Sequence, residues 1–105
     1  MLTIMIHAKI KENRIDEYIE TITFLTESTK KIGCINYSFN QNIQSPTEFV
    51  LYEQWASQDH LDRHIAELFK LLGPANPGEP IPKKLMELYE SVTPINYKVV
   101  AQNAS

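Results

Sequence analysis

The sequence predicts an α+β fold in which strands and helices follow one another in the order β-α-β-β-α-β. Three observations predict it. Residues 2–10 alternate in polarity with the period of a strand, residues 15–32 and 61–72 repeat apolar side chains with the spacing of a helix, and turn-rich segments separate these runs. At 105 residues the chain has room for one hydrophobic core. We therefore expect a single domain over residues 1–105, ordered to about residue 101.

The first strand and the first helix follow from simple periodicity. Between Leu2 and Ile10 the even positions are apolar, whereas the odd positions include His7 and Lys9, so this strand should have two different faces. Asn13 is a suitable N-cap for the helix that follows. Apolar spacing then continues from residue 15 to residue 32, where Gly33 should end the helix.

The middle of the chain predicts a hairpin and a second helix. Residues 34–40 and 48–56 are the two strands, and the segment NIQSPT between them is the turn. Ser57 should cap the second helix, whose core-facing stripe is Leu61, Ile65, Leu68 and Leu72. The segment GPANPGEP must end this helix and form a loop. A short helix over residues 83–90 and a last strand over residues 95–101 complete the fold.

This order of elements is that of a ferredoxin-like sandwich, in which both helices cover the same face of an antiparallel sheet. The other face is left uncovered. In the third strand that face should carry either Leu51, Glu53 and Trp55 or Val50, Tyr52 and Gln54, and in the first strand Met5, His7 and Lys9. Either set exposes apolar surface. Two such sheets packed face to face as a homodimeric α+β barrel would cover it.

Composition and charge exclude several classes of partner and location. A net charge of -3 and a pI near 5.5, with Lys30/Lys31 and Lys83/Lys84 as the basic pairs, give no surface for nucleic acid. Cys34 is the single cysteine, so no internal disulfide can form. The first residues lack the unbroken apolar run of a signal peptide, and no stretch reaches the roughly 20 apolar residues of a membrane span. A cytoplasmic protein without membrane contact is expected.

Three short motifs, GCINY, FVLYEQW and SQDHLDRH, resemble in order and spacing the "GC-x-x-Y … VL-x-E-x-W … S-x-x-x-L-x-x-H" pattern of the antibiotic biosynthesis monooxygenase (ABM) superfamily. The resemblance extends over the chain to about Val100. It implies a homodimeric α+β barrel with a cavity between sheet and helices in each protomer. Members of the superfamily include small quinol and anthrone monooxygenases that use neither metal nor flavin, and also haem-degrading enzymes.

The resemblance also suggests catalytic residues. Trp55 matches the tryptophan that lines the substrate cavity, and His64 matches a histidine of the second helix. His7 lies near the position where haem-degrading relatives carry an asparagine. Because an imidazole titrates near neutrality, His7 or His64 could be the general base. We expect His7 to face the same cavity as Trp55. The structural alternatives are a core tryptophan at Trp55 and a packing or capping histidine at His64.

Other side chains complete the expected substrate site. Asn36, Tyr37 and Ser38 are candidate donors to an oxyanion, and Leu51, Glu53 and Phe69 are candidate contacts to the substrate. Glu53 shares a strand face with Trp55, so its carboxyl group must be paired or have a raised pKa. Pairing in a structural role is the alternative for this residue.

The sequence predicts neither a metal nor an organic cofactor. His60 and His64 form an H-x3-H pair, but a third ligand would have to come from Glu67 or His7, no HExxH motif is present, and Cys34 has no cysteine partner. His60, in the first turn of the helix, should instead be solvated. No GxGxxG or P-loop motif is present that would bind a dinucleotide or nucleotide phosphate.

Departures from the superfamily pattern leave two functions open. Phe69 stands where many members have a second histidine, Leu51 stands where anthrone-oxidising members have an asparagine, and residues 65–72 lack the histidine of haem-degrading members. Haem degradation is therefore disfavoured. The main hypothesis is a cofactor-independent monooxygenase that oxidises a small electron-rich aromatic of the quinol or anthrone type with O2. The alternative is a non-catalytic dimer of the same fold that binds a small apolar ligand.

Overall fold

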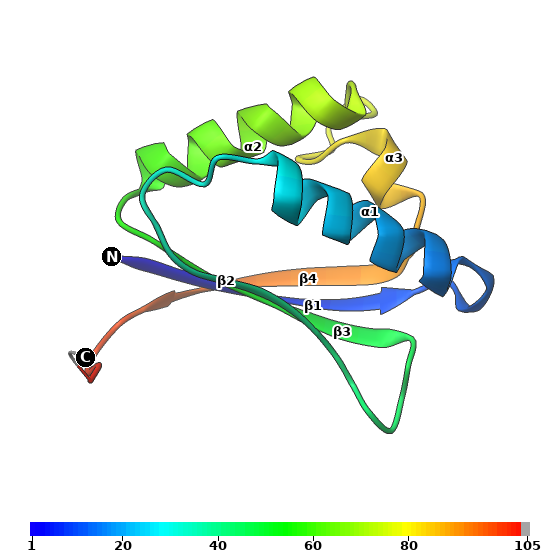
Figure 1. The fold of residues 1–105 in the computed structure, drawn as a ribbon, viewed down its shortest axis with the longest axis horizontal. Coiled ribbons are helices and arrows are strands. Elements are labelled where there is room, and N and C mark those ends of the chain that lie inside the picture. Colours follow the sequence, from blue (N-terminus) through cyan, green and yellow to red (C-terminus); the bar gives the residue numbers. More distant parts are fainter. Residues whose placement is uncertain (104–105) are drawn as a thin grey trace.

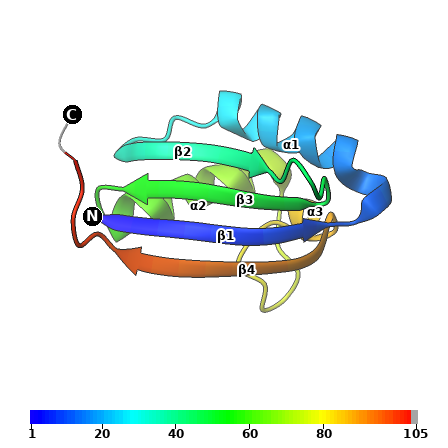
Figure 2. The ribbon, with the colours of Figure 1, turned by 90° about the horizontal axis from the view of Figure 1, so that it is seen from below.

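The computed structural model describes residues 1–103 as an antiparallel sheet with its helices gathered on one face (Figure 1). The elements in chain order are β1 (Leu2–Ile10), the 3-10 helix η1 (Glu12–Arg14), α1 (Ile15–Ser28), β2 (Cys34–Gln41), β3 (Glu48–Trp55), α2 (Gln58–Leu72), α3 (Lys83–Met86) and β4 (Tyr89–Lys98). The strand order is β2-β3-β1-β4, which Figure 2 shows from below. The predicted ferredoxin-like α+β fold is confirmed.

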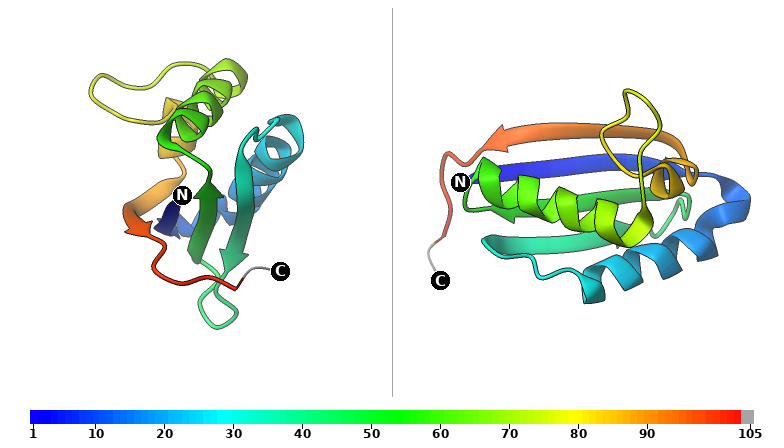
Figure 3. Two further views of the ribbon diagram at one scale, coloured as in Figure 1. Left: turned by 90° about the vertical axis from the view of Figure 1, so that its left-hand side faces the viewer. Right: turned by 90° about the horizontal axis from the view of Figure 1, so that it is seen from above.

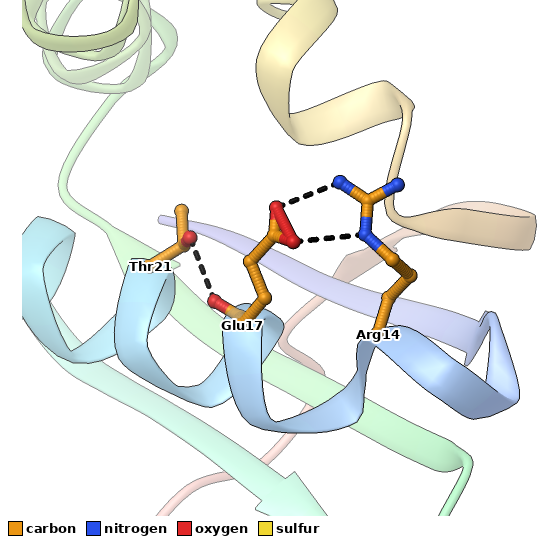
Figure 4. A network of polar contacts seen from close by, with 3 residues as sticks. All are labelled: Arg14, Glu17 and Thr21. Carbon is orange, nitrogen blue, oxygen red and sulfur yellow. Dashed lines mark hydrogen bonds and ion pairs between the residues drawn. The ribbon is translucent and has the colours of Figure 1, made fainter.

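The first helix starts and ends differently from the prediction. Asn13 lies inside η1, and Arg14 occupies the N-cap position of α1 without a side-chain cap bond. Instead, the guanidinium of Arg14 donates two hydrogen bonds to the carboxylate of Glu17, from Nε over 2.8 Å and from a terminal nitrogen over 2.7 Å (Figure 4). Thr21 Oγ1 donates to the carbonyl of Glu17 one turn later (2.8 Å).

At its other end α1 stops at Ser28, before the predicted Ile32, because Thr29 is extended at φ -96° and ψ 145°. Side chains then satisfy the terminal carbonyls that a longer helix would have used. Thr29 Oγ1 donates to the carbonyl of Leu25 (2.8 Å), and Lys31 Nζ donates to the carbonyls of Thr26 and Thr29. The ammonium group of Lys31 therefore caps the negative end of the helix dipole.

The C-terminal part of the chain forms a longer strand than predicted. Helix α3 ends at Met86, so β4 begins at Tyr89 instead of residue 95 and ends at Lys98 instead of residue 101. Pro94 lies within β4, which is an edge strand, and an edge strand can tolerate the missing N–H group of proline. Residues 104 and 105, beyond the region expected to be ordered, lie outside the described residues.

The strand register decides which side chains face the helices. Leu2 pairs with Trp55, Ile4 with Glu53 and Ile6 with Leu51 across β1 and β3. Ile4, Trp55 and Leu61 of α2 form one apolar cluster, which places this set on the helix side of the sheet. The uncovered face, visible below the sheet in the left view of Figure 3, therefore carries the alternate positions Met5, His7, Lys9, Val50, Tyr52 and Gln54.

One end of the uncovered face carries buried polar side chains. Gln54 is buried there, and its Nε2 donates to the hydroxyl of Thr3 (3.1 Å). Its Oε1 accepts hydrogen bonds from the side-chain amides of Asn36 and Gln102. Gln102 belongs to the segment after β4, which runs past the ends of the neighbouring strands in Figure 2. Amide groups thus tie the segment after β4 to the sheet at Gln102.

The hydrophobic core has two parts on the helix side. The larger part surrounds Ile10, Tyr18, Leu25 and Leu88, all of them almost fully buried. The smaller part contains Ile4, Trp55 and Leu61. Both parts contribute to the wall of one cavity, which lies between the sheet and α2. The right view of Figure 3 shows α2 above the sheet.

Candidate functional site

The cavity between sheet and helices has a volume of about 450 Å³. This volume falls in the range of pockets that hold small organic molecules. Its apolar wall includes Ile4, Ile6, Leu51, Leu61, Ile65, Leu68 and Ile81, and its polar side chains include Tyr37, Glu53, His64 and Tyr89. An apolar chamber with a few polar groups is the usual character of a small-ligand site.

Glu53 is the ionisable group that lines this cavity from β3. Strand alternation places it on the helix side, where its side chain is only 4% exposed. Its Oε1 accepts a hydrogen bond from the indole nitrogen of Trp55 over 3.2 Å. Burial raises the pKa of Glu53 to about 7, although the Trp55 hydrogen bond opposes the rise. Near neutral pH the carboxyl group therefore exists in both protonation states.

His64 reaches the same end of the cavity from α2. Its ring centroid lies 4.8 Å from that of Trp55 and 5.2 Å from that of Tyr37. The side chain is 3% exposed, and its Nδ1 has no hydrogen-bond partner among residues 1–103. Burial lowers the pKa of His64 to about 4, so the imidazole is neutral at physiological pH. A buried nitrogen without a partner is a place where a ligand can form a hydrogen bond.

Two tyrosine hydroxyls add uncharged polar groups. Tyr37 lines the cavity from β2, and the ammonium of Lys31 lies 5.5 Å from its ring centroid. Tyr89 lines it from the start of β4, and its hydroxyl lies 3.3 Å from that of Tyr18. Burial raises the pKa of both Tyr37 and Tyr89, so neither phenol ionises near neutral pH.

Trp55 supports the cavity from behind. The indole is fully buried, donates to Glu53 and packs against the ring of His64. It is also part of an apolar cluster with Ile4 and Leu61. Trp55 thus has the expected core role, and it contacts Glu53 and His64 without itself lining the cavity.

His7 does not face the cavity, and our expectation that it shares one with Trp55 is wrong. The register pairs His7 with Val50 on one side and Thr93 on the other, and its side chain is exposed on the uncovered face. The reason is strand alternation, which places Ile6 and Ala8 on the helix side. His7 instead lines an open groove together with Lys9, Asn40 and Glu48.

The other expected contacts divide between the two faces. Asn36 pairs with Gln54 and Ser38 with Tyr52, so both belong to the uncovered face and cannot serve as donors inside the cavity. Tyr37 and Leu51 do line the cavity. Phe69 is half-buried on α2 and does not line it. Tyr37, Leu51, Glu53 and His64, with Trp55 behind them, are thus the predicted residues that the fold brings together.

His60 has a packing role where solvation was expected. Its Nδ1 lies 2.7 Å from the hydroxyl of Ser57, which caps α2 as predicted. Its ring is so close to Gly33 that a Cβ atom on this glycine would lie 2.2 Å from His60 Cδ2. Among residues 1–103, no group of three or more His, Cys, Asp or Glu side chains is arranged to hold a metal ion.

Sequence reasoning missed Tyr89 and Lys31 as neighbours of the site. Tyr89 was assigned to the short helix, and its position at the start of β4 brings it to the cavity. Lys31 was placed inside the first helix, whereas its backbone has φ 53° and its side chain lies over Tyr37. Left-handed backbone at lysine has no clear signal in a single sequence.

Fold and cavity together define a small ferredoxin-like α+β domain with an internal ligand-sized chamber. The sequence profile of one family, antibiotic biosynthesis monooxygenase, matches residues 1–67. The chain belongs to this family, as its three motifs suggested.

Solved structures agree on the fold. A candidate antibiotic biosynthesis monooxygenase from Nitrosomonas europaea superposes with a TM-score of 0.77 at 17% identity, covering 96% of this chain and 100% of that one. A second candidate, from Bacteroides thetaiotaomicron, gives a TM-score of 0.80 at 12% identity, with 99% and 93% covered. A conserved protein from Methanosarcina mazei gives 0.70 at 23% identity, with 92% and 90% covered. At these identities the likeness establishes the fold alone.

A curated relative is similar over part of the chain. It is the uncharacterised protein sll1783 of Synechocystis, 33% identical over 58 residues, which are 54% of this chain and 40% of that protein. The chain thus spans less than half the length of this relative. Over residues 1–103, none of the helices combines the length and the apolar character needed to cross a membrane.

Proposed function

We propose that this domain is a cofactor-independent monooxygenase that oxidises a small electron-rich aromatic of the quinol or anthrone type with O2. One observation carries the proposal: a buried carboxyl group and a neutral imidazole, both in contact with Trp55, line one mostly apolar cavity of about 450 Å³. Membership of the antibiotic biosynthesis monooxygenase family supports the same class of reaction.

The reaction asks three things of the protein: a group that accepts a hydroxyl proton, donors that stabilise the resulting anion, and a chamber without bulk water. The substrate anion passes one electron to O2, and the resulting radical pair combines to a hydroperoxide. Loss of water leaves a quinone-type carbonyl. One oxygen atom thus enters the substrate, and the other leaves as water with two substrate hydrogens.

The cavity contains groups for each requirement. The proton acceptor must line the cavity, which His64 and Glu53 do and His7 does not. The Tyr37 hydroxyl stays protonated and can donate a hydrogen bond to an oxyanion. Apolar side chains such as Leu61 and Leu68 limit the access of water. Trp55 keeps Glu53 and His64 at one end of the chamber.

We propose further that the protein works as a homodimer in the cytoplasm, joined through the uncovered face of the sheet. That face exposes apolar atoms of Ile95 and Tyr97 on β4, which are 38% and 44% exposed, beside Tyr52 and Met5. Burial of these side chains against a second copy would remove them from water.

The second candidate function is binding without turnover. The observation that favours it is the wall of the cavity, which is apolar apart from a few polar groups and needs no reaction to hold a small aromatic. A ligand-binding domain would retain Trp55 and Glu53 to shape the chamber. The two candidates differ in whether O2 is consumed.

An oxygen-electrode screen of hydroquinones, catechols and anthrones tests the function. We expect O2 uptake with at least one of these compounds and its loss in Leu51→Trp, because the larger ring fills the cavity. Ile43→Trp, at a hairpin position that is 97% exposed, is the control and should keep the activity. Binding by calorimetry without O2 uptake would favour the second candidate. Neither binding nor uptake would contradict both.

A further inference from the structure

We propose that the carboxylate of Glu53, and not a histidine, receives the hydroxyl hydrogen of the ligand, and that the ligand therefore enters the cavity as an un-ionised phenol. This inference rests on the proposed function for the identity of the reaction, and it adds the proton acceptor and the charge state of the substrate.

The geometry of Glu53 leaves one oxygen for a ligand. Oε1 is held by the indole N–H of Trp55 at 3.2 Å. Among residues 1–103, no side chain or backbone donor is hydrogen-bonded to Oε2, although the residue is almost fully buried and lines the cavity. A carboxylate oxygen without a donor at the wall of the cavity can accept the hydroxyl hydrogen of a ligand there.

Within residues 1–103, no positively charged group is paired with Glu53. The groups that face it are Trp55 on its own strand, Tyr37 and Cys34 on β2, His64 on α2 and Tyr89 on β4. All of these are neutral near pH 7, because burial raises the pKa of the thiol and of both phenols and lowers that of the imidazole.

Three charged groups lie near the site without pairing with Glu53. Glu67 of α2 lies near His64 and accepts a hydrogen bond from the backbone N–H of Lys30 (2.9 Å). The ammonium of Lys31 lies over the ring of Tyr37 and donates to backbone carbonyls at the end of α1. Glu79 lines the cavity from an exposed position in the loop before α3. A second anion beside Glu53 would be repelled in this apolar setting, so the cavity selects against carboxylate and phenolate ligands.

The proton transfer from the phenol to Glu53 conserves atoms and charge. The O–H bond of the phenol breaks, a new O–H bond forms at Oε2 of Glu53, and the negative charge moves from the carboxylate to the substrate. The phenolate then reacts with O2 as described above, and the protonated carboxyl group can return its proton to the peroxide oxygen that leaves as water. A base is most effective when its pKa is near the working pH. Burial raises the pKa of Glu53 to about 7, whereas it lowers the pKa of His64 to about 4.

His64 then has a different task. Its neutral ring has an Nδ1 without a partner, and it contacts the same indole as Glu53. Whichever ring nitrogen is protonated, a neutral imidazole offers one donor and one acceptor. We assign His64 to a second hydrogen bond with the ligand, which orients the ring for the transfer to Glu53. A dihydroxy aromatic matches these two groups.

Binding of hydroquinone without O2 tests the proton acceptor apart from turnover. Hydroquinone stays un-ionised between pH 5.5 and 8.5 because phenols titrate near about 10. If the carboxylate accepts its hydroxyl hydrogen, protonation of Glu53 must weaken binding. The dissociation constant measured by calorimetry should therefore rise as the pH falls below about 7, by at most about tenfold per pH unit.

Two variants separate the candidate acceptors. Glu53→Gln keeps an oxygen for Trp55 but cannot ionise, so its affinity for hydroquinone should be independent of pH. His64→Gln should bind more weakly and keep the pH dependence. Affinity that rises in acid would mean that Glu53 is a donor and would overturn the inference. So would a wild-type affinity that changes less than about twofold from pH 8 to pH 5.5.

Turnover supplies a second, separate test. If O2 uptake is found, Glu53→Gln should lower kcat by about 10²- to 10⁴-fold and abolish the acid limb of the pH profile. Full activity in this variant, or loss of the acid limb in His64→Gln alone, would overturn the inference. Absence of O2 uptake with every compound would contradict the proposed monooxygenase. The binding experiment would then still decide whether Glu53 accepts the hydrogen of the ligand.

Discussion

The indole nitrogen of Trp55 donates a hydrogen bond to the carboxyl oxygen of Glu53 from two positions along the same strand. Residues at this spacing share one face of a sheet, so β3 itself presents the donor and the acceptor. The ring of Trp55 also packs on His64. Trp55 therefore couples a buried acid from the sheet to a buried imidazole from α2, and several measurable properties follow.

Glu53→Gln should change how stability depends on pH. The folded pKa of Glu53, about 7, is above its ordinary value of 4.5, so the folded state holds the proton more tightly. The wild-type contribution of Glu53 is complete below about pH 4.5 and is lost as the pH rises through 7, roughly 3 kcal/mol in all. Urea unfolding at pH 5 and pH 8 should show the variant gaining relative to wild type at pH 8. An equal difference at both pH values would contradict this prediction.

His64→Gln should show the opposite trend. The folded pKa of His64, about 4, is below its ordinary 6.5, so its contribution is present above 6.5 and is lost as the pH falls toward 4, again roughly 3 kcal/mol. Between pH 4.5 and 6.5, Glu53 makes the wild-type protein less stable as the pH rises, whereas His64 makes it more stable. Over this interval the stability of Glu53→Gln should rise with pH and that of His64→Gln should fall. Parallel curves for the two variants would show that neither group is buried as described.

Trp55→Phe should raise the pKa of Glu53 further, because the hydrogen bond that stabilises the carboxylate is lost while burial remains. The pH interval in which the protein loses stability should therefore extend above 7. Loss of a fully buried indole should also cost about 1–3 kcal/mol at every pH. Carboxyl-carbon NMR of labelled protein measures the first effect directly, and an unchanged titration midpoint would show that the hydrogen bond is not formed.

Gly33→Ala should destabilise the fold by more than the cost of placing alanine at a positive φ. Gly33 has φ +78°, and a Cβ atom there would overlap the ring of His60 at 2.2 Å. Gly78 has a similar φ of +81° with nothing within 4 Å of its added Cβ, so Gly78→Ala is the matched control. We expect about 1 kcal/mol for the control and at least twice that for Gly33→Ala in urea unfolding. Equal losses would mean that the ring of His60 moves aside freely.

Tyr18→Phe should cost about 1 kcal/mol, because it leaves the hydroxyl of Tyr89 without its partner in the core. Ser28→Ala, which removes an exposed hydroxyl at the end of α1, is the control and should change little. Thermal or urea unfolding of the two variants measures the difference. A loss of equal size in both would contradict the importance of the buried pair.

The order of elements could be read from the sequence because apolar periodicity changes from 2 to 3.6 at clear boundaries. The ends of elements were less predictable. Ile32 fits the helical spacing, yet α1 stops at Ser28, because the hydroxyl of Thr29 and the ammonium of Lys31 satisfy its last carbonyls. Such competition by polar side chains leaves the spacing of apolar residues unchanged, so periodicity cannot detect it.

Only part of the site could be predicted, because the sequence does not show which face of a strand lines the cavity. Alternation along β3 left two choices for the face that carries Glu53 and Trp55, and the register with Ile4 and Leu2 decides between them. The same alternation in β1 places His7 outside. Its polarity suggested a functional residue, but a single sequence gives no signal of which strand face a cavity occupies. The roles of the residues in the cavity remain predictions.

The alternation of β3 divides future protein engineering into two separate tasks. Leu51 and Glu53 shape the chamber, whereas Val50 and Tyr52, their immediate neighbours in the chain, lie on the opposite surface. Substitutions at Leu51 and Glu53 should change which ligands the cavity binds. Substitutions at Val50 and Tyr52 should change the contacts that the uncovered face makes with other proteins, and each pair should have little effect on the property of the other. A library randomised at all four positions could therefore be screened for each trait independently.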